Sequence, residues 1–554
     1  MKVGITLYSS FSFTPIELDS IKHVAKSLSD AITSRHELVF LPPAYSYATR
    51  EDSRRMCEEF VRSCDVIVGC PSGQLPATRR RIGSSVPMVG LLLGVLPRGG
   101  WGLDVQVPHL TTGDVLVANC SADLELARKF LPNATARVVP FAYDERVYHA
   151  VDAEERKALR GRLGLREEDR VLVYAGRITL QKNVHTLLRV FSAVQRMVPD
   201  ALLLIAGPTV EHGSPEFGVE PVNLANTVRT LIARLGIPGD RVRVYGGVAP
   251  DTLRGVYNVA DAKVNMTLHH DENFGLSQVE AMACGAPVVG TAWGGLKDTI
   301  VDGVSGYKVS TSVTPVGIKV NWWEAVNRIV SLLRDPAGRE RLRESCIRHA
   351  TESYSQARYQ AAVLETLEAA VEGSRRPAEP LLASDFAREL WSTCSPSNVP
   401  PYRRGHRSYE LYRELMEPVA ARSGEQVAGG APLDARQVVC LASPIAGDGQ
   451  GGFGIDDPMY PFDLEVPEAF REAFEAILAV VREEPAATVE RLSGTVAGRP
   501  LVPDTLAWML ETGLLLRTEP VSGWAAPERI DRRMGEPLFR IQRLDRMSTD
   551  FIVY

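Results

Sequence analysis

The sequence of 554 residues has few cysteines, no long apolar run and no excess of basic charge. Its eight cysteines contain no C-x-x-C pair and are too sparse for a disulfide framework. The longest apolar stretch, residues 86–96, contains proline and glycine and falls short of the roughly 20 residues that cross a bilayer. The N-terminus lacks the basic head, apolar core and cleavage site of a signal peptide. These absences predict a reduced, cytoplasmic protein without an integral membrane segment.

The charge balance argues against a general nucleic-acid binder. Lys and Arg number 62 against 68 Asp and Glu, which gives a formal net charge of -6 and a pI near 6.0. Hydrophobic residues make up 45% and charged residues 23%, as in ordinary globular proteins, so a disordered, collagenous or coiled-coil chain is excluded. At about 150 residues per domain, we expect three or four domains, or two large ones with an extension.

Short apolar runs alternate with amphipathic segments of helical length through the first two-thirds of the chain. The runs are rich in Val, Ile and Leu with little polar alternation, as expected for parallel strands buried on both faces. Strands are expected at residues 3–7, 38–41, 65–69, 88–92, 115–118 and 137–140, and again at 171–174, 202–206, 242–245, 262–265, 287–290 and 307–309. Such strand–helix–strand repetition implies right-handed crossovers and doubly wound sheets.

A charged segment without strand character, residues 152–169, separates the two sets of strands. We therefore expect an α/β fold of two Rossmann-like domains facing a cleft, followed by a mainly helical extension. The expected boundaries are 1–150 for the N-terminal acceptor domain, 151–373 for the nucleotide-sugar domain with its closing helix, 374–380 for a linker and 381–554 for an accessory domain. The order of helices and strand between residues 468 and 518 is similar to a winged helix.

This extension is acidic. Between Asp456 and Glu511 there are twelve acidic and four basic residues, a net charge of -8, which would repel nucleic-acid phosphates. A protein partner or self-association through 381–554 is favoured instead. The run at 447–452 matches G-x-G-x-x-G, but Pro458 and Pro461 deny it the helix that would hold a phosphate, so we predict a loop.

The densest chemical signal begins at Glu272, in E-N-F-G-L-S-Q-V-E, which follows a strand and runs into a helix near Gly275. Backbone N–H groups of Phe274, Gly275 and Leu276 would point out of the helix N-terminus, which suits an anion such as a diphosphate. Glu280, in the second turn, suits a pair of sugar hydroxyls as a bidentate acceptor, and Glu272 can hold hydroxyls of a second sugar.

A second motif follows an earlier buried strand, where Gly176 and Arg177 precede Lys182. These residues stand at the carboxyl edge of the expected sheet, where α/β proteins form ligand sites. Arginine offers a fork of donors to phosphate oxygens and lysine a compact charge, so the two side chains together suit a leaving diphosphate. In isolation, both would be solvated surface charges.

Four adjacent ligand-type residues, His269, His270, Asp271 and Glu272, also invite a metal site. Adjacent side chains of an extended segment point to opposite faces, so the four cannot converge on one ion. We predict ordinary loop residues and no metal.

With these motifs, residues 1–373 resemble the GT-B glycosyltransferases of retaining family 4, most closely from Val171 to Val309. The matching elements are G-R-x4-K from Gly176, E-x-F-G-x4-E-A-M-A-C-G-x-P-V-V from Glu272, and the G-G-x-x-E-x-V-x-D-G-like run from Gly294. The resemblance implies sugar transfer from a nucleotide diphosphate sugar with retention at the anomeric carbon, without a divalent metal or further cofactor.

The resemblance also implies roles for individual residues. Arg177 and Lys182 would bind the diphosphate and, with Glu272, form the catalytic set. The residues expected to bind the donor are Arg177, Lys182, Glu272, Asn273, Phe274, Gly275, Leu276 and, on the ribose, Glu280. The segment 245–250 would lie beside the nucleobase.

The N-terminal half departs from the family pattern. The usual Gly-Gly loop is replaced by Tyr8–Pro15, and Gly94 stands near the position of a histidine. Ser10 and His109 are the acceptor-side candidates, although a lone histidine is more often structural. Two alternatives stay open: a GT-B phosphorylase with phosphate as acceptor, and a non-catalytic nucleotide-sugar-binding protein with 381–554 as its effector or partner-recognition part.

Overall fold

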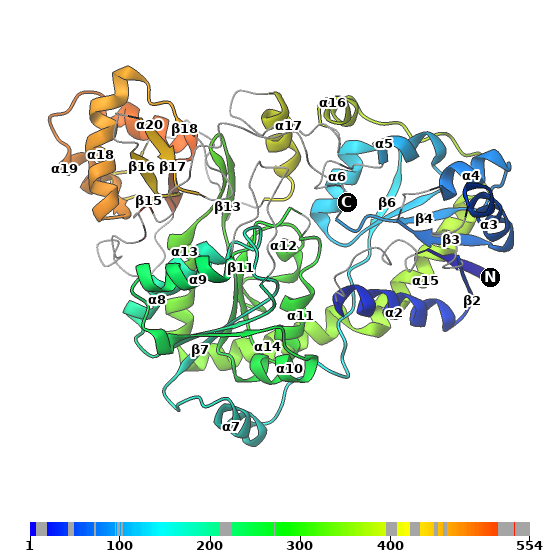
Figure 1. The fold of residues 1–554 in the computed structure, drawn as a ribbon, viewed down its shortest axis with the longest axis horizontal. Coiled ribbons are helices and arrows are strands. Elements are labelled where there is room, and N and C mark those ends of the chain that lie inside the picture. The colour runs from blue at the N-terminus through cyan, green and yellow to red at the C-terminus, as the bar shows by residue number, and fades with distance from the viewer. Residues whose placement is uncertain are drawn as a thin grey trace. The chain divides into compact units, whose positions relative to one another are not determined.

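The computed structural model describes residues 1–6, 19–41, 49–70, 74–94, 96, 100, 103–209, 224–270, 272–394, 407–420, 433–447, 452–457, 463–518, 534 and 537. These residues form two compact units, each assembled from three stretches of chain. The first unit contains 1–148, 270–280 and 348–399, and the second contains 149–269, 281–347 and 400–554. Figure 1 colours the chain from blue at the N-terminus to red at the C-terminus.

The first unit is built on a six-stranded parallel sheet. Its strands are β1 (Lys2–Ile5), β2 (Glu37–Phe40), β3 (Val66–Gly69), β4 (Met88–Leu91), β5 (Val115–Ala118) and β6 (Thr135–Val138), in the order β2-β1-β3-β4-β5-β6. Its helices are α2 (Asp19–Thr33), α3 (Arg50–Ser63), α4 (Leu75–Arg81), α5 (Leu103–Gln106), η3 (Val107–His109), α6 (Ser121–Phe130), α15 (Gln356–Gly373) and α16 (Asp385–Thr393). All six predicted strands are therefore confirmed, and β3, β4 and β5 are buried throughout, as their unbroken apolar runs require.

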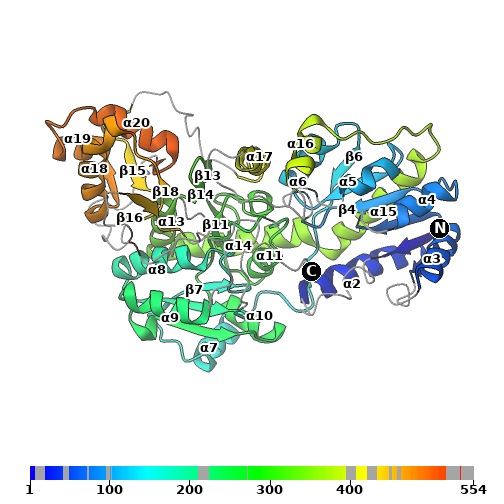
Figure 2. The same ribbon diagram turned by 45° about the horizontal axis from the view of Figure 1, so that its top comes forward.

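Helix α15 returns to this first sheet after the chain has built most of the second unit. It lies beside α2, as Figure 2 shows, and buries Tyr359, Val363, Leu367 and Ala370 in the core formed with β1, β3, β4 and β5. A helix is thus present where the expected closing helix ends domain 151–373, but it belongs to the first compact unit and covers the N-terminal sheet.

A buried ion pair fixes the loops at one end of the first sheet. Arg79 on α4 pairs with Asp114, and the two side chains are 6% and 2% exposed. The Asp114 carboxylate also accepts the N–H groups of Met88 and Thr111, each at 2.8 Å. The Arg79 guanidinium donates to the carbonyl of His109 at 2.9 Å, so every charge and most lone pairs of the network are satisfied.

The second unit carries the other parallel sheet. Its strands are β7 (Arg170–Ala175), β8 (Ala201–Ala206), β9 (Val242–Gly246), β10 (Ala262–Asn265), β11 (Val288–Thr291) and β12 (Gly306–Val309), in the order β12-β11-β10-β7-β8-β9. Its helices are α7 (Ala153–Arg162), α8 (Val184–Met197), α9 (Leu224–Arg234), η5 (Gly239–Arg241), α10 (Pro250–Val259), α12 (Leu296–Thr299) and α13 (Trp322–Arg334), while α11 (Leu276–Ala283) and α14 (Pro336–Tyr354) have residues in both units. These six strands are also confirmed, and their order is that of a dinucleotide-binding sheet, with β7 beside β10 at the topological switch point.

One element of the second unit was not predicted. Strands β13 (Thr311–Thr314) and β14 (Gly317–Val320) form an antiparallel hairpin directly after β12. Seven of its eight strand residues, all but Val313, are buried, so polar and apolar residues do not alternate as they would in a hairpin with one face in solvent. Figures 1 and 2 place this hairpin between α17 and the orange C-terminal module.

The C-terminal extension is mainly helical, as predicted. Its helices are α17 (Arg407–Met416), η6 (Glu468–Phe470), α18 (Arg471–Glu483), α19 (Val489–Thr495) and α20 (Val502–Thr512), and its strands are β15 (Val438–Leu441), β16 (Ile445–Gly447), β17 (Phe453–Ile455), β18 (Asp463–Leu464), β19 (Ala486–Thr488) and β20 (Leu515–Thr518). Gly513 caps α20 with φ +81°, the left-handed conformation that glycine adopts without strain. Of the run at 447–452, predicted to be a loop, Gly447 ends β16 and residues 448–451 lie outside the described residues; strand β17 follows it.

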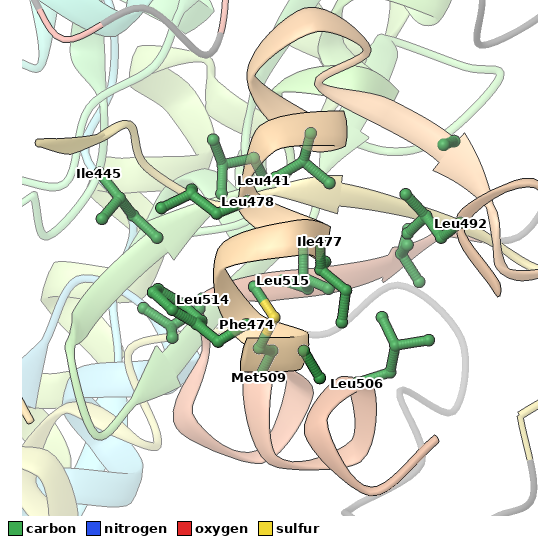
Figure 3. Close-up of a cluster of buried hydrophobic side chains, with 14 of the residues drawn as sticks. Leu441, Ile445, Phe474, Ile477, Leu478, Leu492, Leu506, Met509, Leu514 and Leu515 are labelled. Carbon is green, nitrogen blue, oxygen red and sulfur yellow. The ribbon is translucent and has the colours of Figure 1, made fainter. Parts of the chain in front are cut away.

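The extension has its own apolar core. Figure 3 shows Phe474 and Ile477 of α18 on the side of Met509 and Leu506 of α20. Leu478 lies beside Leu441 of β15 and Ile445 of β16, and Leu515 of β20 belongs to the same cluster. The helix–helix–helix–strand order expected of a winged helix is present. However, the central strand of the sheet β19-β15-β20 is β15, which precedes the first helix of the group. Val316, at the turn of the β13–β14 hairpin, belongs to this same core.

Two further observations concern the chain as a whole. No helix in the described part is long and apolar enough to cross a membrane. All eight cysteines are free, and seven of them are buried.

The Arg79–Asp114 pair gives a stability prediction. Changing Asp114 to Ala leaves a buried guanidinium and two backbone N–H groups without their acceptor, so we expect a loss of about 3–5 kcal/mol in the free energy of unfolding. Changing Asp30 to Ala, which removes only the exposed pair with Lys26, should cost less than about 1 kcal/mol. Urea unfolding of the two variants measures the difference, and equal losses would contradict this account.

Candidate functional site

The loop between β7 and α8 carries Arg177 and Lys182. Strand β7 is buried along almost its whole length and ends at Ala175, directly before Gly176, whose φ is +151°. The N–H of Gly176 donates to Ala206 O at 2.9 Å, and the N–H of Ile178 donates to Pro208 O at 2.9 Å. The loop therefore runs tightly along the end of β8 before it turns into α8.

A close approach between two glycines makes this path possible. A Cβ on Gly207, which has φ +148°, would lie 1.9 Å from the carbonyl oxygen of Gly176. Arg177, the residue after Gly176, is also held: the hydroxyl of the buried Tyr174 donates to Arg177 O at 2.7 Å. The backbone of the loop is thus fixed by the end of β8 and by a buried tyrosine.

Both cationic side chains of the loop are half-buried. In the part of the chain that the structure describes, the guanidinium of Arg177 makes no ion pair or hydrogen bond. The N–H of Lys182 donates to Thr179 Oγ1 at 3.2 Å, and Asn183 then starts α8 in the left-handed conformation, with φ +55°. A partly desolvated arginine without an internal partner is suited to an anionic ligand.

Strand β10 lies beside β7, so the second motif follows the neighbouring strand. Lys263 on β10 is fully buried, donates to Ala175 O at 3.2 Å and has its Nζ 5.6 Å from the Tyr257 ring centroid. After β10 the N–H of Leu268 donates to Gln181 O at 3.2 Å. The segment leading to Glu272 is therefore hydrogen-bonded to the loop that carries Lys182.

The same segment is held from its other side. Trp293, which is fully buried, donates its Nε1–H to His269 O at 2.8 Å, and Thr291 Oγ1 donates to Thr267 O at 2.7 Å. Sequence reasoning missed Lys263 and Trp293. The signal for Lys263 was a charged residue inside an otherwise apolar strand, A-K-V-N.

Helix α11 begins as the sequence predicted. Gly275 has φ +84°, and its carbonyl accepts the N–H of Gln278 at 2.9 Å, which starts the helix. Within the described residues, no protein acceptor takes the N–H groups of Phe274, Gly275 and Leu276. These amides are therefore available to an anion, as the donor-site prediction requires.

Side chains around this helix start have structural contacts in the first unit. Phe274 is 2% exposed and meets Phe141 and Tyr354 edge-to-face, with ring centroids 5.5 and 5.4 Å apart. Asn273 donates from Nδ2 to Asn119 Oδ1 at 3.2 Å. These contacts orient the backbone of the turn, so the predicted role of Phe274 through its main chain is compatible with a buried ring.

The predicted site residues fall in both compact units. Glu272, Asn273, Phe274, Gly275, Leu276 and Glu280 belong to the first, and Arg177 and Lys182 to the second. Glu272 and Glu280 are half-buried, and each interacts with other groups of the protein. Their convergence with Arg177 and Lys182 on one ligand stays a prediction.

The acceptor-side candidates have mixed outcomes. Ser10 and the loop Tyr8–Pro15 lie outside the described residues. His109 ends η3, and the Arg79 network holds its carbonyl. Gly94 follows β4 with φ +70°, the left-handed conformation that glycine adopts without strain.

Two other predicted features lie in the second unit. Residues 245–250 run from the end of β9 into α10, with Tyr245 partly exposed. Within the described residues, no group of three or more His, Cys, Asp or Glu side chains could hold a metal ion, and Asp271 lies outside them.

Comparison with known proteins adds the following. Residues 155–352 match the family model described as "Glycosyl transferases group 1". A D-inositol 3-phosphate glycosyltransferase of Segniliparus rotundus is 35% identical over 206 residues, which are 37% of this chain and 40% of the relative. A protein of the same name from Mycolicibacterium vanbaalenii is 40% identical over 157 residues, 27% of this chain and 32% of the relative. The chain thus spans two fifths or less of the length of these relatives.

Two solved structures share the fold. HepE of Anabaena, in complex with UDP and glucose, superposes with a TM-score of 0.50 at 16% identity, covering 66% of this chain and 99% of that one. Sucrose-phosphate synthase of Thermosynechococcus elongatus superposes with the same TM-score and identity, covering 66% and 98%. The two Rossmann-like domains therefore have the GT-B fold.

The glycine contact gives a prediction for the β7–α8 loop. Changing Gly207 to Ala places a methyl group on the Gly176 carbonyl, so the loop must shift, and we expect a loss of at least about 1–3 kcal/mol in the free energy of unfolding. Gly239→Ala is the matched control, because its Cβ would meet no atom within 4 Å. Thermal unfolding measures both variants, and an unchanged Tm for Gly207→Ala would contradict the close approach.

Proposed function

We propose that this protein is a retaining glycosyltransferase that moves a sugar from a nucleotide diphosphate sugar to an acceptor nucleophile. One observation carries the proposal: the two motifs follow β7 and β10, the neighbouring strands at the switch point of the second sheet. Open α/β sheets bind ligands at this place. The match of residues 155–352 to the group 1 model and the GT-B fold support the same reading.

The proposed chemistry centres on the leaving diphosphate. Arg177, Lys182 and the open N–H groups near Gly275 stabilise the negative charge that develops as the bond to the sugar breaks. The backbone of the β7–α8 loop is held in place by the end of β8 and by Tyr174, so the part of the chain that carries these groups needs little reorganisation in the transition state. Arg177 contributes a fork of donors and Lys182 a compact charge.

The remaining donor contacts follow from the family resemblance. Glu272 holds hydroxyls of the transferred sugar, and Glu280 holds the ribose. The acceptor hydroxyl attacks from the side of the leaving group and gives its proton to a phosphate oxygen. Retention then needs neither a dedicated protein base nor a divalent metal, and the nucleotide sugar is the only co-substrate.

For the acceptor, we propose only a chemical class. The relatives named above act, by their names, on an inositol phosphate, so a small hydroxylated acceptor is the first class to test. We place the reaction in the cytoplasm, because eight free cysteines suit a reducing compartment.

A second candidate is a non-catalytic protein that binds a nucleotide sugar. The observation that favours it is Gly94, which stands near the position of the histidine usual in the resembling family. Slow hydrolysis of the nucleotide sugar without any acceptor would decide for the enzyme.

Ligand binding is tested by thermal shift against a panel of nucleotide sugars. A ligand at about 100 times its Kd should stabilise the native state by about 2.7 kcal/mol and raise the Tm by a few degrees. A flat response across UDP-, GDP- and ADP-sugars would contradict the proposal.

The roles of Arg177 and Lys182 are tested by changing each to Ala with the best ligand of that panel. Each variant should lose about 10²–10³-fold in turnover, because one charge on the developing diphosphate is lost. The Tm should change little, since neither side chain is fully buried. Lys157→Ala on α7 removes an exposed lysine and should retain full activity. Near-normal turnover in the Arg177 and Lys182 variants would overturn the mechanism.

A further inference from the structure

A buried cluster of charges joins the C-terminal extension to the second sheet's domain. Arg189 on α8 lies 3.7 Å from Asp456, and the two side chains are 6% and 0% exposed. Lys319 on β14, with its side chain 1% exposed, donates to Asp457 Oδ2 at 3.1 Å and to Ser443 Oγ at 3.0 Å. Two cations of the domain thus meet two carboxylates of the extension. We call these four residues the charge cluster.

The cluster makes the extension part of the domain rather than an attached module. A buried charge is tolerated only when it is paired, and each pair here has one partner on either side. Burial, together with Arg189 and Lys319, lowers the pKa of the neighbouring His185 to about 4, so at neutral pH this ring adds no further cation. Without the extension, Arg189 and Lys319 would be uncompensated.

The charge cluster also lies against the loop that carries Lys182. A cavity of about 40 Å³ is lined by the cluster together with Asn183 and Leu268. Asn183 directly follows Lys182 and starts α8, and Leu268 donates to Gln181 O. Arg189 stands in the second turn of the helix that Asn183 begins. The pairing of Arg189 with Asp456 therefore holds the helix on which the loop ends.

A separate part of the extension holds the segment after β10. The N–H of Gly294 donates to Val419 O at 2.8 Å, and Lys297 Nζ donates to Pro418 O at 2.6 Å. The adjacent Trp293 forms a bridge with Ala420 and donates to His269 O. The extension thus contacts both the helix that follows the β7–α8 loop and the residues that hold the segment after β10.

The hairpin β13–β14 completes this attachment. The Tyr409 hydroxyl on α17 accepts the N–H of Gly317 at 2.8 Å and donates to Thr314 O at 3.0 Å. On the other side, Trp322 Nε1 donates to Leu441 O at 2.7 Å, and Asn321 Nδ2 donates to Thr518 Oγ1 at 2.6 Å. The extension is therefore hydrogen-bonded to the hairpin and to the start of α13.

We propose that the C-terminal extension sets the conformation of the loop from Gly176 to Asn183, and that Asp456 is a positioning residue that acts on it through Arg189. The inference rests on the proposed function for the ligand that the loop binds, a diphosphate. Loss of the positioning should weaken diphosphate binding while leaving Arg177 and Lys182 in the chain.

Hydrogen exchange of the ligand-free protein tests the positioning directly. In Asp456→Asn, an isosteric change, peptides covering residues 176–186 should exchange at least tenfold faster, while peptides of β8 keep the wild-type rate. Asp504→Asn removes an exposed carboxylate of the same extension and should leave both regions unchanged. An unchanged loop in Asp456→Asn, or faster exchange spread equally over the loop and β8, would overturn the proposal.

A milder variant keeps the test decisive should Asp456→Asn fail to fold. Arg189→Lys retains the charge but loses the guanidinium fork. It should raise exchange in 176–186 by a smaller factor with β8 unaffected, and a loop that exchanges as in the wild type would overturn the inference.

Titration with UDP, GDP and ADP gives the second readout. For whichever of the three binds the wild type, the Kd should rise at least fivefold in Asp456→Asn and stay unchanged in Asp504→Asn. An unchanged Kd in Asp456→Asn would count against the positioning role. Should none bind the wild type, the proposed function fails, and the exchange experiment on the free protein still decides the inference.

Discussion

The parallel pairing of β7 with β10 is the constraint on which the candidate site depends. It places the chain after Ala175 and the chain after Asn265 at one edge of the sheet, although 86 residues lie between the two strands. Buried Lys263 reinforces that edge by donating to Ala175 O, and the bond from Leu268 to Gln181 O ties the two outgoing segments together. The proposed diphosphate site would draw on both outgoing segments, with backbone N–H groups acting beside Arg177 and Lys182.

Much of this could be predicted because the local pattern and the tertiary environment agree. The strands of both sheets are mostly apolar runs, so their burial on both faces can be predicted from the sequence. The start of α11 could be predicted as well, because a glycine directly precedes the helical run that begins at Leu276. The hairpin β13–β14 was not, because its sequence, T-S-V-T-P-V-G-I-K-V, contains a lysine that is buried only through Asp457, more than a hundred residues away. Trp293 and Arg189 were missed for the same reason: their partners lie in other elements.

The extension shows how far composition alone can mislead about the boundary of a domain. Its linker, acidity and change of pattern after Gly373 favour a separate module. Yet residues 380–382 contact the first unit through Leu110 and Asn133, while residues from 407 onward contact the second. Charges that look like a solvated acidic face in the sequence include Asp456 and Asp457, which are paired inside the protein. Residues that follow one another in the extension therefore belong to different compact units.

The return of α15 to the N-terminal sheet bears on how the protein is made. Tyr359, Val363, Leu367 and Ala370 belong to the core that β1, β3, β4 and β5 begin. During synthesis, all six strands of that sheet leave the ribosome more than two hundred residues before this helix does. The part of the nascent sheet that α15 covers beside α2 therefore stays exposed while the second sheet is translated, and apolar surface exposed for so long favours aggregation.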